Sequence, residues 1–168
     1  MKEHTLLWKQ FHNNKITHSA AHYLMAIDDI AQNNSSVRLI DVAEYLDTSI
    51  GSLYTSLQPL IKKKFILQDE QRHLTLSLEA KKIVVQVKNT AQVCEYFFHD
   101  ILGVEGSIAS QDACKIEHLL SKETTLALIH HIHSLLKQEQ CMSSGLSNKE
   151  KCNLCKNKSC IFSVLKNL

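Results

Sequence analysis

Two short segments with apolar residues at helical spacing, 38–46 and 52–64, most limit how this chain can fold, because only a tight turn at 47–51 separates them. Their apolar faces consist of Ile40, Val42, Ala43 and Leu46, and of Leu53, Leu57, Leu60 and Ile61. Two short amphipathic helices joined by such a turn have the layout of a helix-turn-helix. Pro59 lacks the backbone N–H that a helix interior needs, so we expect the second helix either to bend there or to have its first turns end early.

A β-hairpin is predicted directly after these helices. Residues 65–67 are β-prone, 69–72 form a polar turn, and 73–77 alternate between apolar and polar side chains. A helix-turn-helix followed by a hairpin describes a winged helix. The first part of the chain is therefore predicted to be a winged-helix domain.

The second helix of this winged helix carries short hydroxyl side chains, and basic residues follow it. The residues expected to face the bases are Ser49, Ser52, Tyr54, Thr55 and Ser56, and those expected to contact phosphates are Lys62, Lys63, Lys64 and Arg72. Taken alone, the lysine run fits a solvated helix end equally well. The net charge of +2 is too small to indicate nucleic acid by itself. Joined to the helix-turn-helix and the hairpin, these residues predict a double-stranded DNA operator as partner.

The rest of the chain is expected to be mostly helical, since its 168 residues contain only one Pro and four Gly. The expected helices cover 17–31, 78–102, 110–120 and 121–136. Thr17 or Ser19 is expected to cap the first, Gly103 and Gly106 to end the second, and Ser110 to cap the third. The predicted fold class is thus mostly α, with an N-terminal winged helix followed by a helical domain.

The chain shows no apolar run that approaches a membrane span, and its N-terminus lacks the apolar core of a signal peptide. We therefore expect a cytoplasmic protein without a membrane partner. In a reducing compartment its six cysteines are not expected to form a disulfide framework. They are expected to be buried thiols, metal ligands or redox-active groups.

A possible metal motif lies in the predicted third helix, where Cys114, Glu117 and His118 are three and four residues apart. A thiolate, a carboxylate and an imidazole on one turn suit Fe(II), Ni(II) or Zn(II) better than Ca or Mg. From spacing alone, a buried Cys114 beside two solvent-facing polar residues is the more common arrangement. The pair His18 and His22 leaves the same two alternatives open. The cluster at 130–133 is interpreted as a polar helix face.

Four cysteines crowd the C-terminal end with the spacing Cys141-x10-Cys152-x2-Cys155-x4-Cys160. Residues 138–157 are too polar to fold by burial alone. Four thiolates are the ligands of tetrahedral zinc or of a [4Fe-4S] cluster. The cluster is favoured, because the spacing is not the paired Cys-x2-Cys of zinc ribbons. Unrelated free thiols remain the alternative.

Three segments carry a resemblance to the diphtheria toxin repressor family of iron- and manganese-dependent transcriptional regulators: 40–46, 98–104 and 112–118. The resemblance implies that Cys114, Glu117 and His118 are metal ligands, joined by the first-helix position that falls on His22. A cysteine at position 114 resembles the iron-sensing branch. The family's second metal site would use positions 91, 95 and 110. Here they hold Ala91, Glu95 and Ser110, of which only the glutamate is a metal ligand.

We therefore expect a winged-helix DNA-binding domain at 1–82, a helical dimerisation and metal-binding domain at 83–138, and a cysteine-rich tail at 139–168. The expected function is that of a homodimeric, non-enzymatic repressor of metal-homeostasis genes. Its expected cofactors are Fe2+ or another divalent transition metal, and a [4Fe-4S] cluster or Zn2+ in the tail. The alternatives are a metal-free thiol-switch regulator and a zinc hydrolase with Glu117 as base.

Overall fold

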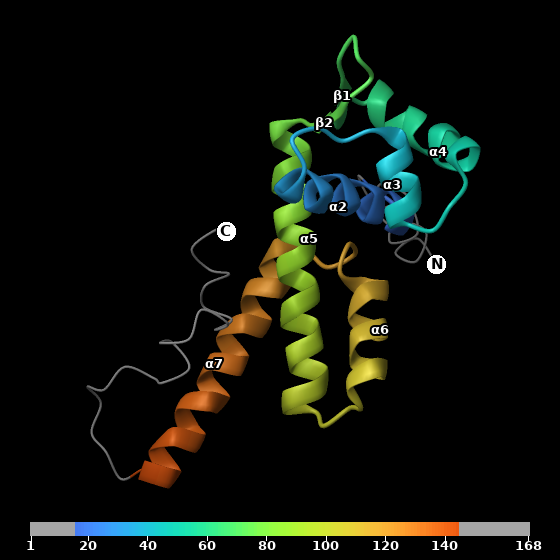
Figure 1. The fold of residues 1–168 in the computed structure, drawn as a ribbon. Helices are drawn as coiled ribbons and strands as arrows, with labels where there is room; N and C mark the ends of the chain where they lie inside the picture. Colours follow the sequence, from blue (N-terminus) through green and yellow to red (C-terminus); the bar gives the residue numbers. More distant parts are fainter. Residues whose placement is uncertain (1–15, 145–168) are drawn as a thin grey trace, which may run out of the picture. The chain divides into compact units, whose positions relative to one another are not determined.

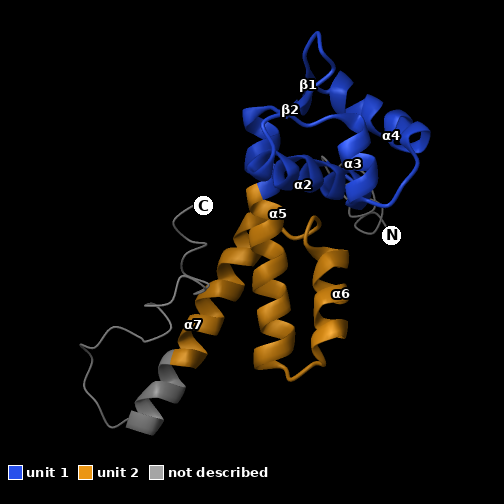
Figure 2. Ribbon diagram, in the orientation of Figure 1, with its two compact units in different colours: residues 1–84 blue, residues 85–168 orange. Residues whose placement is uncertain are grey.

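The computed structural model describes residues 16–144 (Figure 1). The chain forms two compact units, residues 1–84 and 85–168, here called unit 1 and unit 2 (Figure 2). Cys152, Cys155 and Cys160 lie outside the described residues, so the four-thiolate site predicted for the tail lies largely outside them too. Within the described part of the chain, no helix is both long enough and apolar enough to cross a membrane.

Unit 1 is a helix-turn-helix followed by a two-stranded hairpin, as the sequence predicts. Its elements are α2 (His18–Asn33), α3 (Leu39–Tyr45), α4 (Ile50–Lys62), β1 (Ile66–Gln68), β2 (Leu74–Leu76) and the first turns of α5 (Leu78–Tyr96). The two strands are antiparallel, with Ile66 opposite Leu76 and Gln68 opposite Leu74. The predicted winged helix is therefore present.

Local signals fix the helix starts of unit 1. Thr17 caps α2 by accepting a hydrogen bond from the backbone N–H of Ala20, and Ser49 caps α4 in the same way. Helix α4 continues through Pro59 to Lys62, so it does not end at the proline. The backbone N–H of Lys63 donates to the carbonyl of Pro59 over 3.0 Å, which closes the last turn.

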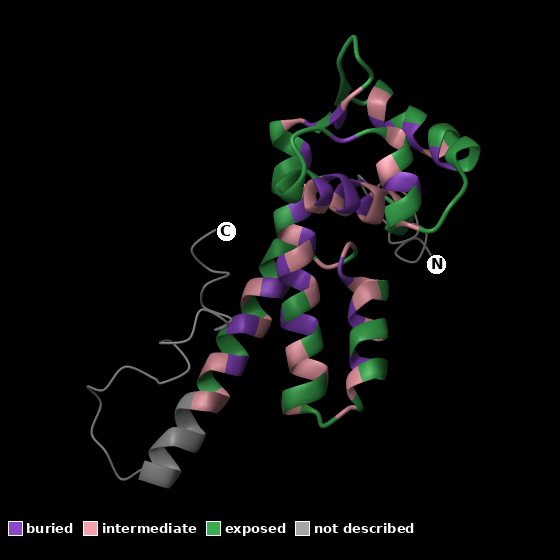
Figure 3. Ribbon diagram, in the orientation of Figure 1, coloured by how far each residue is buried: buried purple, intermediate pink, exposed green. Residues whose placement is uncertain are grey.

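The core of unit 1 lies between α2, the helix-turn-helix and the inner face of the hairpin (Figure 3). Its fully buried large side chains include Leu24, Ile27, Leu53, Leu57, Ile66 and Leu74. Burial of apolar surface on this scale is the main force that holds α4 in place. The opposite face of α4 is left exposed.

Unit 2 contains the rest of α5, a π-helical turn η1 (Phe97–Ile101), α6 (Gly106–Ile116) and α7 (Lys122–Ser144). Val93 of α5 packs with Ile129 and Ile132 of α7, and all three are at most 1% exposed. The hydroxyls of Thr90 and Thr125 lie 3.1 Å apart in this buried layer. Helices α5 and α7 are thus joined by both apolar and polar contacts.

Several helix ends in unit 2 differ from the prediction. The long helix expected to reach residue 102 changes to π-helical geometry at Phe97, before Gly103 ends it with a φ of 72°. Gly106 does not stop a helix, since it is the first residue of α6. Helix α7 extends to Ser144, eight residues beyond the predicted end at 136 and into the segment assigned to the tail.

The cap of α6 is also not the predicted one. Glu105 caps this helix by accepting from the backbone N–H groups of Ser107 and Ile108 over 3.0 and 3.2 Å. Ser110 is an interior residue of the helix, so its prediction as the cap is wrong. The physical reason is tertiary: Ala109 is fully buried, and the helix must begin before it to present that face inward.

Candidate metal centre and DNA-binding face

In unit 2, Cys114 and Glu117 lie together at the C-terminal end of α6. The helix ends at Ile116, but Glu117 keeps helical backbone angles and its N–H donates to the carbonyl of Ala113 over 2.9 Å. The thiol and the carboxylate therefore stay on one face, and a carboxylate oxygen of Glu117 lies within 4.8 Å of Sγ of Cys114. His118 follows directly, half-buried, in the turn after the helix rather than within it.

Burial controls the protonation of these groups. Glu117 is only 5% exposed, and this burial raises the pKa of its carboxyl to about 7. Burial, followed by the neighbouring Glu117 charge, also raises the pKa of the Cys114 thiol. Both groups would be deprotonated more readily beside a divalent cation, so metal binding at this place would release protons. The donor set of thiolate and carboxylate fits a borderline transition metal.

A second thiol close to Glu117 is Cys94 of α5, which is buried, whereas Cys114 is half-buried. Cys94 is 1% exposed, and burial followed by the Glu117 charge raises its pKa to about 11. We expect Cys94 to resist alkylation by iodoacetamide at pH 8, where about one thiol in a thousand is ionised. Peptide mass spectrometry should find it labelled slowly in the native protein, faster as pH rises, and rapidly in urea. Equal labelling rates in the native and unfolded protein would contradict this prediction.

In unit 1, His22 forms a pair with His18 on the first turns of α2. The two ring centroids are 4.4 Å apart at an interplanar angle of 69°, and the two rings offer nitrogens within 4.8 Å of each other. Burial, followed by the His18 charge, lowers the pKa of His22, which favours the neutral imidazole that binds metals. The sequence leaves both histidines open as ligands from their spacing of four residues, and the family resemblance implies His22 alone.

The positions that correspond to the family's second metal site, 91, 95 and 110, also lie in unit 2. Ala91 is half-buried, while Glu95 and Ser110 are exposed. His130 and His131 are exposed on α7, as expected for a polar helix face, and the ring of His131 lies 6.5 Å from that of Phe97. The side chains at 91 and 110 supply no strong metal ligand.

The residues predicted to bind DNA lie on the outer face of the winged helix. Ser49, Ser52, Tyr54 and Thr55 are exposed and Ser56 is half-buried, while Lys62, Lys63, Lys64 and Arg72 are all exposed. Two of the hydroxyls already form hydrogen bonds with the backbone. Ser49 caps α4, and Thr55 donates to the carbonyl of Gly51 over 3.1 Å. Ser52 and the 56% exposed Tyr54 lie beside them on the same helix start.

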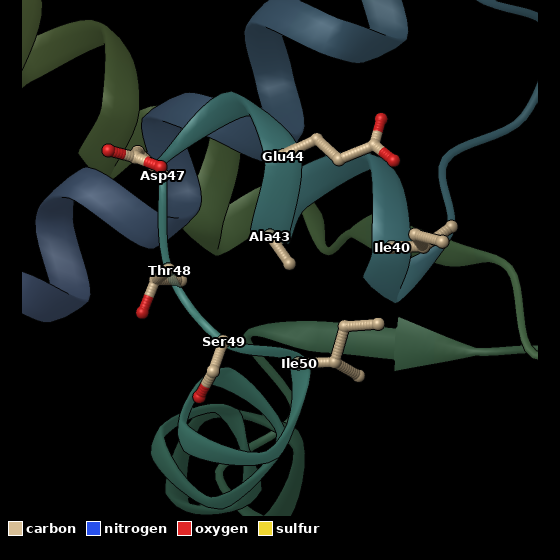
Figure 4. A pocket seen from close by; sticks show the side chains of 7 residues that line it. All are labelled: Ile40, Ala43, Glu44, Asp47, Thr48, Ser49 and Ile50. Carbon is tan, nitrogen blue, oxygen red and sulfur yellow. The ribbon is translucent and has the colours of Figure 1, made fainter.

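An open hollow lies beside the start of α4 (Figure 4). It is lined by Ile40, Ala43, Glu44, Asp47, Thr48, Ser49 and Ile50. Ile40 and Ile50 are each 47% exposed there, and neither is among the residues predicted from the sequence to bind DNA. Exposed apolar side chains beside a recognition helix suit the methyl group of thymine. The carboxylates of Glu44 and Asp47 in the same lining disfavour a phosphate.

Comparison with known proteins gives consistent similarities. Residues 78–141 match the family described as iron dependent repressor, metal binding and dimerisation domain. The chain is 30% identical over 107 residues to the transcriptional regulator MntR of Salmonella typhimurium, covering 64% of this chain and 68% of MntR.

Two solved structures have a similar fold, each with a TM-score of 0.60. The hypothetical protein SSo2273 from Sulfolobus solfataricus is 13% identical, and the match covers 71% of this chain and 91% of that one. The manganese regulator SloR is 17% identical, and the match covers 67% of this chain and 53% of SloR. Such levels of identity support the fold alone.

Proposed function

Since this chain belongs to the iron-dependent repressor family of metal-dependent transcriptional regulators, we propose that it is an iron-responsive, homodimeric repressor of metal-homeostasis genes. Members of this family are transcriptional regulators and not enzymes, which argues against the zinc hydrolase alternative. The proposed location is the cytoplasm, where such a regulator would meet its DNA.

The proposed regulatory site consists of His22, Cys114, Glu117 and His118. The observation that carries it is the buried carboxylate of Glu117 within 4.8 Å of the Cys114 thiol on one face of α6. Thiolate and imidazole donors favour Fe(II) over Mn(II), which prefers oxygen ligands. We therefore propose Fe2+ as the physiological ion, although the structurally similar SloR is named as a manganese regulator.

The proposed mechanism follows from where these residues belong. His22 is a residue of unit 1, whereas Cys114, Glu117 and His118 are residues of unit 2. A bound divalent ion supplies the positive charge that brings these donors together. By sharing that ion, the four side chains couple the winged helix to the dimerisation domain and favour one spacing of the two recognition helices in a dimer.

Removal of the metal tests this function directly. We expect the full-length protein, prepared without oxygen, to select a DNA sequence from a random library only when Fe2+ is present. Chelation should then lower its affinity for the selected DNA by roughly 5- to 150-fold, the usual range of coupling between two sites. Fluorescence anisotropy measures the affinity. Equal binding with and without metal would show that the ion does not regulate this protein.

For the tail we propose a [4Fe-4S] cluster or Zn2+ held by Cys141, Cys152, Cys155 and Cys160. Four thiolates within twenty residues are the supporting observation. Anaerobic purification followed by metal and sulfide analysis separates the two: we expect a brown protein with about four iron and four sulfide in the tail. A colourless protein with one zinc and no sulfide would reject the cluster, and a metal-free tail would favour the thiol switch.

A further inference from the structure

We propose that His18 is a further ligand of the ion that His22 binds, and that this second imidazole of α2 makes the site prefer Fe(II), Co(II) and Zn(II) to Mn(II). The inference rests on the proposed function, since it concerns the same regulatory ion. It adds to that function a ligand and a cause for metal selectivity.

The geometry of α2 places both rings on one face. His18 and His22 are one helical turn apart, and their ring nitrogens are at most 4.8 Å from each other. Nitrogens bound to one ion at about 2.0–2.1 Å lie roughly 2.9 to 3.3 Å apart, for bond angles of about 90 to 109°. The difference is therefore at most about 1.9 Å, and because His18 is exposed, a change of its side-chain rotamer would close it.

The two histidines differ in how firmly the fold holds them. His22 is half-buried and therefore held in place, whereas His18 stands exposed as the first residue of α2, directly after the cap Thr17. Two histidines spaced four apart on a helix face are a known zinc-binding arrangement. The positive end of the helix dipole repels a cation, so this pair alone should bind weakly. The anionic Cys114 and Glu117 are needed to complete the site.

Selectivity follows from the chemistry of the donors. Imidazole raises affinity for Fe(II), Co(II), Ni(II) and Zn(II), whereas Mn(II) lies lowest in the affinity series and gains most from carboxylate, carbonyl and water oxygens. With His18 included, the proposed donors are three imidazoles, one thiolate and one carboxylate. This set contains a single oxygen ligand from a side chain and is therefore poorly matched to Mn(II).

The test measures Co2+ and Mn2+ affinities by competition with a chromophoric chelator. It uses the full-length protein with Cys141, Cys152, Cys155 and Cys160 replaced by serine, so that tail thiols do not compete. Loss of a residue that only orients a ligand costs about 10- to 100-fold in metal affinity. His18→Ala should therefore weaken Co2+ binding by at least about tenfold and Mn2+ binding by less, and should change the visible spectrum of bound Co2+. His130→Ala, an exposed histidine on α7, is the matched control and should change neither affinity.

The outcomes separate the inference from the function on which it rests. Unchanged Co2+ affinity in His18→Ala, with strong loss in Glu117→Gln, would overturn the inference and leave the regulatory site intact. Equal weakening of Co2+ and Mn2+ in His18→Ala would overturn the claim of selectivity. Unchanged Co2+ affinity in Glu117→Gln would instead overturn the proposed function itself. A second variant, His18→Asp, should shift the preference toward Mn2+, because it replaces an imidazole by a carboxylate.

Discussion

Cys114→Ala is expected to abolish the gain in DNA affinity that iron gives. The substitution removes the only thiolate of the proposed regulatory site, whose Sγ lies within 4.8 Å of a carboxylate oxygen of the buried Glu117. Metal affinity should fall by more than about 100-fold, since loss of an orienting residue alone costs 10- to 100-fold. With iron present, the affinity for DNA should then equal that of the metal-free protein, a loss of roughly 5- to 150-fold.

Isothermal titration calorimetry with Fe2+ under anaerobic conditions, together with anisotropy on labelled DNA, measures both quantities. Cys94→Ala is the matched control, because Cys94 is a buried thiol of the same unit that is not proposed as a ligand. It should lower stability but keep the response to iron. A Cys114→Ala protein that still binds DNA more tightly in iron would remove Cys114 from the site.

Replacing Lys62, Lys63 and Lys64 by glutamine is the second change with a large expected effect. All three side chains are exposed at the end of α4 in the winged helix. The proposed homodimer carries this change twice, so if each of its six lysines contacts one phosphate, the slope of log K against log salt becomes smaller by about 5.4, since each contact contributes about 0.9. Anisotropy at several salt concentrations between 50 and 200 mM measures this slope, and binding at the lowest salt should weaken the most.

A double variant of unit 2, Lys115→Gln with Lys122→Gln, serves as the control for net charge. Both residues are exposed and lie outside the winged helix. The control should change the slope little. If both variants lower the slope by the same amount per charge removed, DNA binding depends on total charge, and the assignment of the lysine run to phosphates fails.

Much of unit 1 could be predicted because its signals are local. The apolar periodicity of α3 and α4, the cap at Thr17 and the polar turn of the hairpin all depend on residues within about four positions of each other. The same holds for Cys114 and Glu117, whose spacing places them on one helix face wherever the helix lies. Of the two expectations for Pro59, an early end of the helix is wrong, since α4 stays helical across the proline with Leu57 and Leu60 buried on either side of it.

The ends of the helices in unit 2 could not be predicted from local sequence alone. Ser110 is a good cap by local rules, but the burial of Ala109 and Ala113 requires a helix that starts at Gly106. Similarly, Ile129 and Ile132 pack against Val93 from a segment more than thirty residues away. A stretch of a few residues carries no information on such contacts, so the predicted ends of these helices differ from the observed ones.

By itself, the sequence determined the winged helix, the mostly helical remainder, the family and the spacing of the thiol, carboxylate and imidazole donors. Only the tertiary structure decided that Glu117 is buried with a pKa near 7, and that His22 is half-buried whereas His18 is exposed. The reason is that spacing follows from the regular geometry of a helix. Burial and protonation depend on which distant side chains exclude water from a group.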